Sequence, residues 1–290
     1  RLICSGRKAN IFLKGVWRWH AEKPPEKTQV GVYPYVFPPV GPGHKDAVGG
    51  LYNAMIYPLA PYAVRGVLWY QGEGNHSKPQ QYRELLPAMI KCWRELWHDS
   101  RLPFIVVQLP NYGQPASKPS QKSYWAGLRE AQQMTAANDP YTSLVVTIDV
   151  GDANNMHPKN KKDVAWRALL AAWKNVYHKA KDGDSPVYKG MEESGGKVIV
   201  KIKNDGKRLL CKGDRINGFM LAGKNMVFYR ANAEMLSDNR IAVSSPSVAK
   251  PAAVRYAWAD NPENCNIYNN NDLPLAPFRS DTSEKERIKK

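Results

Sequence analysis

Residues 66–75 decide the fold, and they read Gly-Val-Leu-Trp-Tyr-Gln-Gly-Glu-Gly-Asn. The first half is apolar and favours β-structure, which predicts a buried strand over residues 63–70. The second half breaks into polar side chains set between glycines. Open α/β sheets bind ligands at the carboxyl ends of their strands, so Gln71, Glu73 and Asn75 are candidate site residues. The alternative is a strand followed by a simple tight turn.

Strands and helices alternate along the chain around this stretch. Residues 103–109 and 144–150 are apolar runs typical of buried strands. Helical spacing of apolar side chains predicts helices over residues 79–97, 125–137 and 162–179. The last helix carries an apolar stripe that we expect to face the core, formed by Trp166, Leu169, Leu170, Trp173, Val176 and Tyr177. This order predicts an α/β fold with a parallel sheet flanked by helices.

The pattern changes near residue 182, and only short alternating segments separated by turn residues follow. They predict a small antiparallel β-rich region, either a sandwich or an extension of the sheet edge. We therefore expect four parts: a lead-in rich in proline and aromatic residues, an α/β domain, a β-rich domain and a charged tail. Their predicted bounds are residues 1–50, 51–181, 186–281 and 282–290.

Composition narrows the classes of function. The chain has 290 residues and a formal net charge of +16, which invites a nucleic-acid interpretation. The basic residues are spread, however, and no zinc-finger, RNP or basic-helix pattern accompanies them, so we expect no nucleic-acid partner. No run of 18 apolar residues exists, so no membrane partner is expected either. The four cysteines lack metal-ligand spacing and are too few for a disulfide scaffold.

A second polar cluster, residues 149–157, follows the predicted strand over residues 144–150. It combines aspartates with His157, which is suited to act as a general base. Gln71 and Asn75 each carry a side-chain N–H that can stabilise an oxyanion. A metal site is the competing interpretation, since Asp149, Asp152, Glu73 and His157 are all plausible ligands, but they lack a tight ligand spacing.

Five collinear stretches resemble the sialate O-acetylesterase family, a group of SGNH-type serine hydrolases. They are GLYNAMIYPL (50–59), GVLWYQGEGN (66–75), LREAQ (128–132), a TIDVGD…HPKNK pattern (147–161) and AVRYAWADNP (253–262). The similarity extends from about residue 51 to residue 281. It implies an SGNH-like parallel sheet, incomplete at its N-terminal side, followed by the β-rich domain.

The resemblance also implies a chemistry, namely hydrolysis of acetyl esters on O-acetylated sugars or glycans through an acyl-enzyme, with no cofactor or metal. His157 matches the family's catalytic histidine, and Gln71 matches the amide of its oxyanion region, with Glu73 and Asn75 supporting the site. The family suggests a secreted or periplasmic location, although the first residues do not form a signal peptide. The sequence gives no indication of oligomeric state.

Two departures from the family pattern bear on activity. The family's Gly-Gln-Ser-Asn or Gly-Asp-Ser-Asn nucleophile block is not recognisable, and Ser5 lacks its flanking residues. We therefore expect a chain that begins inside the catalytic domain and has little or no esterase activity. The position two before His157 is Asn155, where the family commonly has Asp, so Asp152 is the first candidate for the His-orienting acid and Asp149 the second. Either aspartate could instead cap a turn.

A catalytically inactive carbohydrate-binding fragment is the alternative function. The chain has nine tryptophans, whose rings can stack on sugars when they are exposed. Nucleic-acid binding is a third hypothesis, and it rests on the net charge alone.

Overall fold

The computed structural model describes residues 3–6, 9–12, 49–116, 118–119, 122–205, 208–262 and 264–281. The chain divides into two compact units, residues 1–64 with 94–99, and residues 65–93 with 100–290. In the first unit β1 (Ile3–Gly6) pairs with β2 (Ala9–Phe12) in antiparallel fashion. A short helix follows as a π-helical turn, η1 (Tyr52–Ile56), and a 3-10 turn, η2 (Tyr57–Leu59). Most of the predicted lead-in over residues 1–50 lies outside the described residues.

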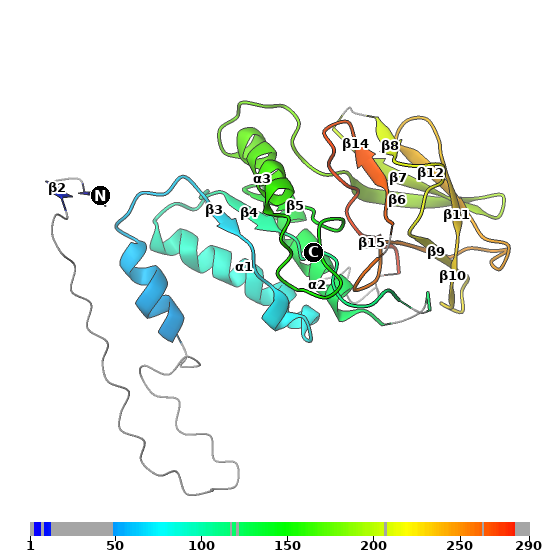
Figure 1. The fold of residues 1–290 in the computed structure, drawn as a ribbon, viewed down its shortest axis with the longest axis horizontal. Coiled ribbons are helices and arrows are strands. Elements are labelled where there is room, and N and C mark those ends of the chain that lie inside the picture. The colour runs from blue at the N-terminus through cyan, green and yellow to red at the C-terminus, as the bar shows by residue number, and fades with distance from the viewer. Residues whose placement is uncertain are drawn as a thin grey trace, which may run out of the picture. The chain divides into compact units, whose positions relative to one another are not determined.

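The second unit contains a three-stranded parallel sheet in the order β3 (Val67–Trp69), β4 (Phe104–Val107) and β5 (Thr142–Val145). Helix α1 (Pro79–Leu96) connects β3 to β4, and α2 (Tyr124–Ala137) connects β4 to β5. Helix α3 (Lys161–Asn175) follows β5 (Figure 1). The predicted α/β class, a parallel sheet flanked by helices, is confirmed.

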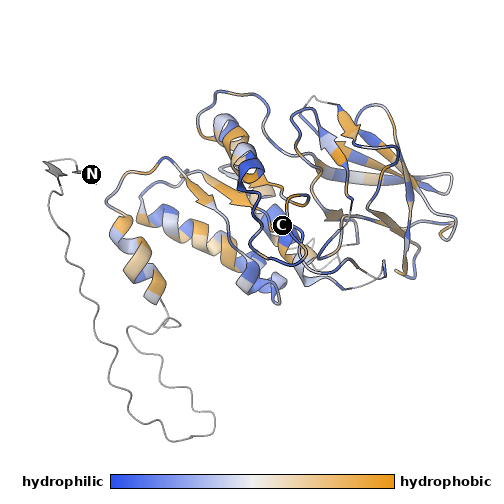
Figure 2. Cartoon of the chain, in the orientation of Figure 1, coloured by the Kyte–Doolittle hydropathy of each residue, from blue (hydrophilic) through white to orange (hydrophobic). Residues whose placement is uncertain are grey.

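Strand β4 is buried on both faces, as expected for the centre of such a sheet. Ile105 and Val107 share a hydrophobic cluster with Val164 of α3. On the other face, the Phe104 ring lies 6.0 Å from the ring of Trp93 in α1. Successive side chains of a strand point to opposite faces, so the run Phe-Ile-Val-Val supplies a core to both helical layers. Figure 2 shows β3 and β4 coloured as hydrophobic segments.

Helix α3 presents a different face to the sheet from the one we predicted. Its buried residues are Val164, Arg167, Ala168 and Ala171. Trp166 is 50% exposed and Trp173 is 39% exposed, so the expectation of a core-facing tryptophan stripe is wrong. Small alanines allow the helix to approach the sheet closely, and the burial of Arg167 is made possible by an ion pair described below. Among the described residues, no helix combines the length and apolarity needed to cross a lipid bilayer.

The region after α3 is an antiparallel β-sandwich. One sheet has the order β10 (Phe228–Arg230), β9 (Phe219–Ala222), β13 (Ala253–Tyr256) and β15 (Phe278–Arg279). The other has the order β11 (Asn232–Met235), β12 (Arg240–Ser244), β7 (Lys197–Lys203) and β6 (Val187–Ser194). A short pair, β14 (Ile267–Asn269) and β8 (Leu209–Cys211), completes the region. The predicted antiparallel β-rich region is confirmed.

Alternation along the strands explains the sandwich. In β7 the side chains of Val198, Val200 and Ile202 are buried, the three lysines of the strand are exposed, and Ile199 is half-buried. These three residues belong to the same hydrophobic cluster as Leu221 of β9 and Val254 of β13. The two sheets therefore share one core, as in sandwich folds generally.

Ion pairs attach the sandwich to the helices of the α/β part. Glu130 of α2 accepts hydrogen bonds from Arg279 of β15 at 2.8 and 2.9 Å. Arg83 of α1 donates to the same carboxylate at 2.5 Å. All three side chains are largely shielded from water, where bidentate arginine–carboxylate pairs fix geometry strongly. Val146 and Ile148, which follow β5, belong to the hydrophobic cluster of the sandwich, so the α/β part and the sandwich are joined by this specific contact as well as by shared apolar packing.

Cysteine reactivity offers a test of this core. Cys265 is buried in the sandwich, and its burial raises the pKa of its thiol from 9.0 to about 12. Because the thiolate is the reactive form, this shift lowers the reactive fraction of Cys265. Cys92 on α1 is exposed. We expect iodoacetamide to label Cys92 rapidly and Cys265 only after unfolding, as read by peptide mass spectrometry. Equal labelling rates in the folded protein would contradict this packing.

Candidate active site

The first candidate loop starts where β3 ends. Gln71 leads into Gly72, and the 3-10 turn η3 (Glu73–Asn75) follows. The Glu73 carboxylate accepts a hydrogen bond from the backbone N–H of Gly72 at 3.0 Å. A Cβ atom at Gly72 would lie 2.7 Å from a methyl group of Leu128, and the φ of Gly72 is 158°, which side-chain-bearing residues rarely adopt. Packing and backbone conformation together therefore favour glycine at this position.

The side chain of Gln71 is oriented by an aromatic pair. Trp69 donates its indole N–H to the hydroxyl of Tyr82 at 3.2 Å. That hydroxyl in turn lies 3.4 Å from both oxygen atoms of Gln71, the side-chain Oε1 and the backbone carbonyl. Because Tyr82 already accepts from Trp69, its own proton is directed to Gln71. Among the described residues nothing accepts from Gln71 Nε2, so this amide is free to donate.

Gln132 of helix α2 contacts the same loop through its side-chain amide. Gln132 donates its side-chain N–H to the carbonyl of Gln71 at 3.2 Å and to that of Val107 at 3.3 Å. Its Oε1 accepts from the backbone N–H of Leu109 at 2.9 Å. Gln132 is fully buried, so this single amide ties the ends of β3 and β4 together.

The second candidate loop begins with Asp149, which is occupied by structural contacts. Arg167 of α3 donates to both of its carboxylate oxygens, at 2.6 and 2.7 Å. Tyr268 donates its hydroxyl to the same carboxylate at 2.9 Å. Burial and the neighbouring Asp149 charge raise the pKa of Tyr268, which keeps this hydroxyl protonated as a donor. Asp149 therefore anchors α3 and the sandwich.

Asp152 and Asn155 shape the turn that leads to His157. Asp152 Oδ1 accepts from the backbone N–H of Asn154 at 2.9 Å, as aspartates do in Asx turns. Asn155 Oδ1 accepts from the backbone N–H of His157 at 2.9 Å. The His157 side chain is exposed, and none of the described residues forms a hydrogen bond with its imidazole. The second carboxylate oxygen of Asp152 is likewise without a partner in the described part of the chain.

The two loops lie at the same edge of the sheet, since β3 and β5 run parallel to β4. A direct contact also links them, because the ammonium of Lys161 lies 4.8 Å from the centre of the Tyr70 ring. Tyr70 immediately precedes Gln71, and Lys161 begins the helix that follows His157. The structure thus brings the predicted clusters to one side of the sheet, as the strand-end argument expected.

A third segment supports the second loop. Asn111, just after β4, accepts the backbone N–H of Gly151 with its Oδ1 at 2.7 Å. Its Nδ2 donates to Asn261 at 3.0 Å, and Asn261 donates to the carbonyl of Gly113 at 2.7 Å. Gly113 also donates its N–H to Ala153 at 3.1 Å. This network reaches from the turn before His157 into the sandwich.

Sequence reasoning missed several of these supporting residues. Gln132 and Arg129 both lie in the LREAQ stretch, three residues apart and therefore on one face of α2. A buried face that carries an arginine and a glutamine indicates polar partners in the core, which is the signal available in the sequence. Tyr82 and Asn111 have no comparable signal, because their partners lie at least 11 residues away.

The same side-chain contacts test the alternative interpretation of the cluster as a metal site. Within the described ranges, no group of three or more His, Cys, Asp or Glu side chains is placed to hold an ion. Both oxygens of Asp149 are engaged by Arg167 and Tyr268. Glu73 Oε2 and Asp152 Oδ1 accept from backbone N–H groups. Among the described residues, the amide of Gln71 and the imidazole of His157 have no hydrogen-bond partner, and such groups suit acyl-transfer chemistry.

Comparison with known proteins also points to ester hydrolysis. Residues 44–172 match a family described as carbohydrate esterase, sialic acid-specific acetylesterase. Sialate O-acetylesterase of Homo sapiens is 28% identical over 260 residues, covering 79% of this chain and 48% of that protein. The Mus musculus protein of the same name is 27% identical over 265 residues, covering 81% and 48%.

A solved structure is also similar. A carbohydrate acetylesterase from Xanthomonas citri superposes with a TM-score of 0.76 and is 41% identical, covering 80% of this chain and 54% of that one. The chain thus spans about half the length of the relatives it matches. The resemblance inferred from the sequence is confirmed.

Proposed function

We propose, from this confirmed resemblance to the sialate O-acetylesterase family, that the chain carries the histidine and amide parts of a carbohydrate O-acetylesterase site. The reaction is hydrolysis of acetyl esters on sugars, with an O-acetylated sugar or glycan as the substrate. One observation supports it most: the Gln71 Nε2 amide and the His157 imidazole, neither of which has a hydrogen-bond partner among the described residues, occupy loops at the same edge of the parallel sheet.

The proposed mechanism assigns a role to each of these groups. A serine attacks the acetyl carbonyl, and His157 accepts its proton. The side-chain N–H groups of Gln71 and Asn75 stabilise the oxyanion, which collapses to an acetyl-serine as the sugar leaves with the proton held by His157. Water, deprotonated by His157, then attacks the acetyl-serine, and acetate leaves as the serine regains its proton. Glu73 holds the loop by accepting from Gly72. The nucleophilic serine is not assigned to a position in this sequence.

Asp152 is the proposed His-orienting acid. Its Oδ1 is used in the turn, but Oδ2 has no partner among the described residues, so it can accept from the imidazole. Asp149 is less suited, because Arg167 and Tyr268 engage both of its oxygens. An oriented histidine stays in the correct tautomer to take the serine proton.

Replacing His157 tests the proposal. We expect His157→Asn to lower acetate release from O-acetylated N-acetylneuraminic acid about 1000-fold in the natural polypeptide that carries these residues, because a positioned general base is lost. His178→Asn is the control, since His178 is exposed, lies after α3 and has a φ of 53° that asparagine also adopts. The 290-residue chain alone should show little or no turnover of p-nitrophenyl acetate. Unchanged acetate release by His157→Asn would overturn the proposal.

Carbohydrate binding without hydrolysis is the second candidate function. The exposed rings of Trp166 and Trp173 on α3 favour it, because both lie on one side of the helix and are available for stacking on sugars. Calorimetry with acetylated and deacetylated glycans separates the two functions. Binding of both glycans with no acetate released, even by the natural polypeptide, would favour the second.

A further inference from the structure

Asn261, in the segment that follows β13, is linked to the turn before His157 by two routes of hydrogen bonds. On the first route its Oδ1 accepts from Nδ2 of Asn111 at 3.0 Å. Oδ1 of Asn111 then accepts from the backbone N–H of Gly151 at 2.7 Å. A buried amide beyond the sandwich strand therefore reaches this turn through a single intermediate side chain, although 150 residues separate Asn261 from Asn111 in the sequence.

The second route runs through backbone groups. Nδ2 of Asn261 donates to the carbonyl of Gly113 at 2.7 Å. The N–H of Gly113 donates to the carbonyl of Ala153 at 3.1 Å. The two routes thus end on Gly151 and Ala153, the residues on either side of Asp152. Two contacts fix both the position and the direction of a turn, whereas one contact leaves it free to rotate.

Local bonds give this turn its shape. Oδ1 of Asp152 accepts from the N–H of Asn154 at 2.9 Å, and Oδ1 of Asn155 accepts from the N–H of His157 at 2.9 Å. Both bonds join residues two apart in the sequence, so they do not set the place of the turn relative to the rest of the site. The last three of these residues are exposed, and packing contributes little to holding them. The two routes to Asn261 supply that constraint.

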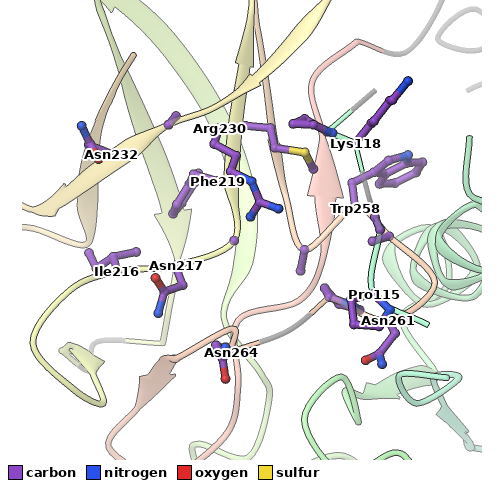
Figure 3. Close-up of a pocket in the computed structure, with 18 of the residues that line it drawn as sticks. Pro115, Lys118, Ile216, Asn217, Phe219, Arg230, Asn232, Trp258, Asn261 and Asn264 are labelled. Carbon is purple, nitrogen blue, oxygen red and sulfur yellow. The ribbon is translucent and has the colours of Figure 1, made fainter. Parts of the chain in front are cut away.

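Asn261 is a rigid anchor for both routes. It is 6% exposed, and both polar groups of its side chain are engaged. Arg129 of α2 donates to the carbonyls of Ala259 at 2.7 Å and Asp260 at 2.8 Å, which fixes the backbone immediately before it. A parallel bridge joins Asn261 to Pro115, and Figure 3 shows these two residues side by side in the lining of a cavity of about 380 Å³. The preceding residues therefore attach the segment to α2, and the Asn261 side chain holds the turn.

The segment after β4 that carries Asn111 is tied to the other candidate loop as well. Leu109 donates its backbone N–H to Oε1 of Gln132 at 2.9 Å, and Gln132 donates to the carbonyl of Gln71 at 3.2 Å. Strand β4 lies between β3 and β5, so the segment that follows it lies between the two loops. The two routes therefore set the place of His157 relative to Gln71.

We propose that Asn261 is a positioning residue for the ester hydrolysis, acting through the turn that carries His157. Asn261 has no assigned contact with the substrate, and it holds the imidazole where it can take the serine proton. The inference rests on the proposed function, and it gives the β-rich region a part in the rate of the reaction. A displacement of about 1 Å in such a group can lower a rate about 100-fold. The AWADNP stretch (257–262) thereby acquires a role.

Asn261→Leu tests this role, because leucine has a similar size and forms neither bond. In the natural polypeptide we expect kcat for acetate release from O-acetylated N-acetylneuraminic acid to fall about tenfold or more, with KM within about twofold of the wild type. Asn266→Leu is the matched control. Asn266 lies in the same segment and donates to the carbonyls of Lys212 and Arg215, both at 2.8 Å, so the substitution removes amide bonds that lead away from the two loops. Its kcat should stay near that of the wild type.

Asn111→Asp breaks the same connection from the other side, and it serves if Asn261→Leu does not fold. The aspartate keeps the oxygen that accepts from Gly151 but loses the N–H that donates to Asn261. We expect the same fall in kcat with little change in KM. Far-UV circular dichroism confirms that each variant is folded.

Hydrogen exchange followed by mass spectrometry reports on the turn without any need for activity. In the same polypeptides we expect the amides of residues 150–157 to exchange about tenfold faster in Asn261→Leu than in the wild type, since the bonds that hold the turn are lost. Asn266→Leu should leave exchange over these residues unchanged.

The outcomes are distinct. Faster exchange over residues 150–157, together with a lower kcat and a nearly constant KM, supports the role. Unchanged exchange or unchanged kcat in the folded variants would overturn it, as would an equal fall in kcat for Asn266→Leu, which would show a general loss of stability. If His157→Asn leaves acetate release unchanged, the esterase proposal itself fails. If His157→Asn abolishes release and Asn261→Leu does not lower it, the positioning role alone fails.

Discussion

Arg129→Met is expected to lower the free energy of unfolding by about 4 kcal/mol, because a buried hub of charge-assisted hydrogen bonds is lost. Arg129 on α2 is 0% exposed. Its guanidinium donates to the carbonyls of Leu109 at 2.8 Å, Pro110 at 2.7 Å, Ala259 at 2.7 Å and Asp260 at 2.8 Å. Methionine fills a similar volume but donates to none of them, so four buried carbonyls lose a donor.

The charge of Arg129 explains why four backbone carbonyls surround its guanidinium. Burial lowers the pKa of Arg129 to about 9, and the nearby Asp260 charge only partly opposes that shift. A cation so far from water is costly unless its donors are satisfied. The four carbonyls come from the end of β4 and from the segment after β13, so Arg129 also fixes the α/β part against the sandwich.

Urea unfolding followed by far-UV circular dichroism measures the loss. Arg65→Met is the control, since Arg65 is exposed and substitutions of this kind change stability by about 0.5 kcal/mol or less. Arg129→Lys should fall between the two, because one ammonium cannot reach carbonyls on two sides at once. A midpoint for Arg129→Met equal to that of Arg65→Met would show that the hub contributes nothing.

The fold class was accessible from sequence because apolar runs and helical spacing are local signals. The run over residues 103–109 predicted β4 within a residue or two of its ends. Helix α3 shows where such signals stop. Its tryptophans are more apolar than Arg167, yet Arg167 is buried and Trp166 is half exposed. The cause is Asp149, 18 residues away, whose carboxylate pairs with Arg167 and makes its burial possible.

The candidate site also has features that local sequence signals predict and features that distant contacts determine. Strand-end polarity was enough to bring Gln71 and His157 to one edge of the sheet, since that follows from parallel topology alone. The sequence ranks Asp152 ahead of Asp149 as the His-orienting acid, with a turn cap as the alternative for either. The structure uses Asp152 Oδ1 for a local turn two residues along, which the sequence already offered as the alternative, whereas Asp149 pairs with Arg167, 18 residues away, a contact that spacing does not reveal.

Gly151→Ala is the second substitution for which we expect a large effect, a loss of about 3 kcal/mol of unfolding free energy together with loss of the site geometry. A Cβ atom at this position would lie 1.8 Å from the backbone oxygen of Asn111 and 2.5 Å from its side-chain oxygen. Backbone atoms cannot rotate away as a flexible side chain does. The clash also breaks the 2.7 Å bond from Gly151 N–H to Asn111.

The displaced turn is the one that carries Asp152 and His157, so the two effects are linked. We expect Gly151→Ala to lower acetate release in the natural polypeptide even at temperatures where the variant is folded, because the histidine moves relative to Gln71. Gly190→Ala is the control: nothing lies within 4 Å of its added Cβ, so stability and turnover should both stay near the wild type. Urea midpoints and turnover are measured on both variants. If Gly151→Ala retained normal turnover, the packing of this loop against Asn111 would not position His157, and the proposed site would lose its main structural support.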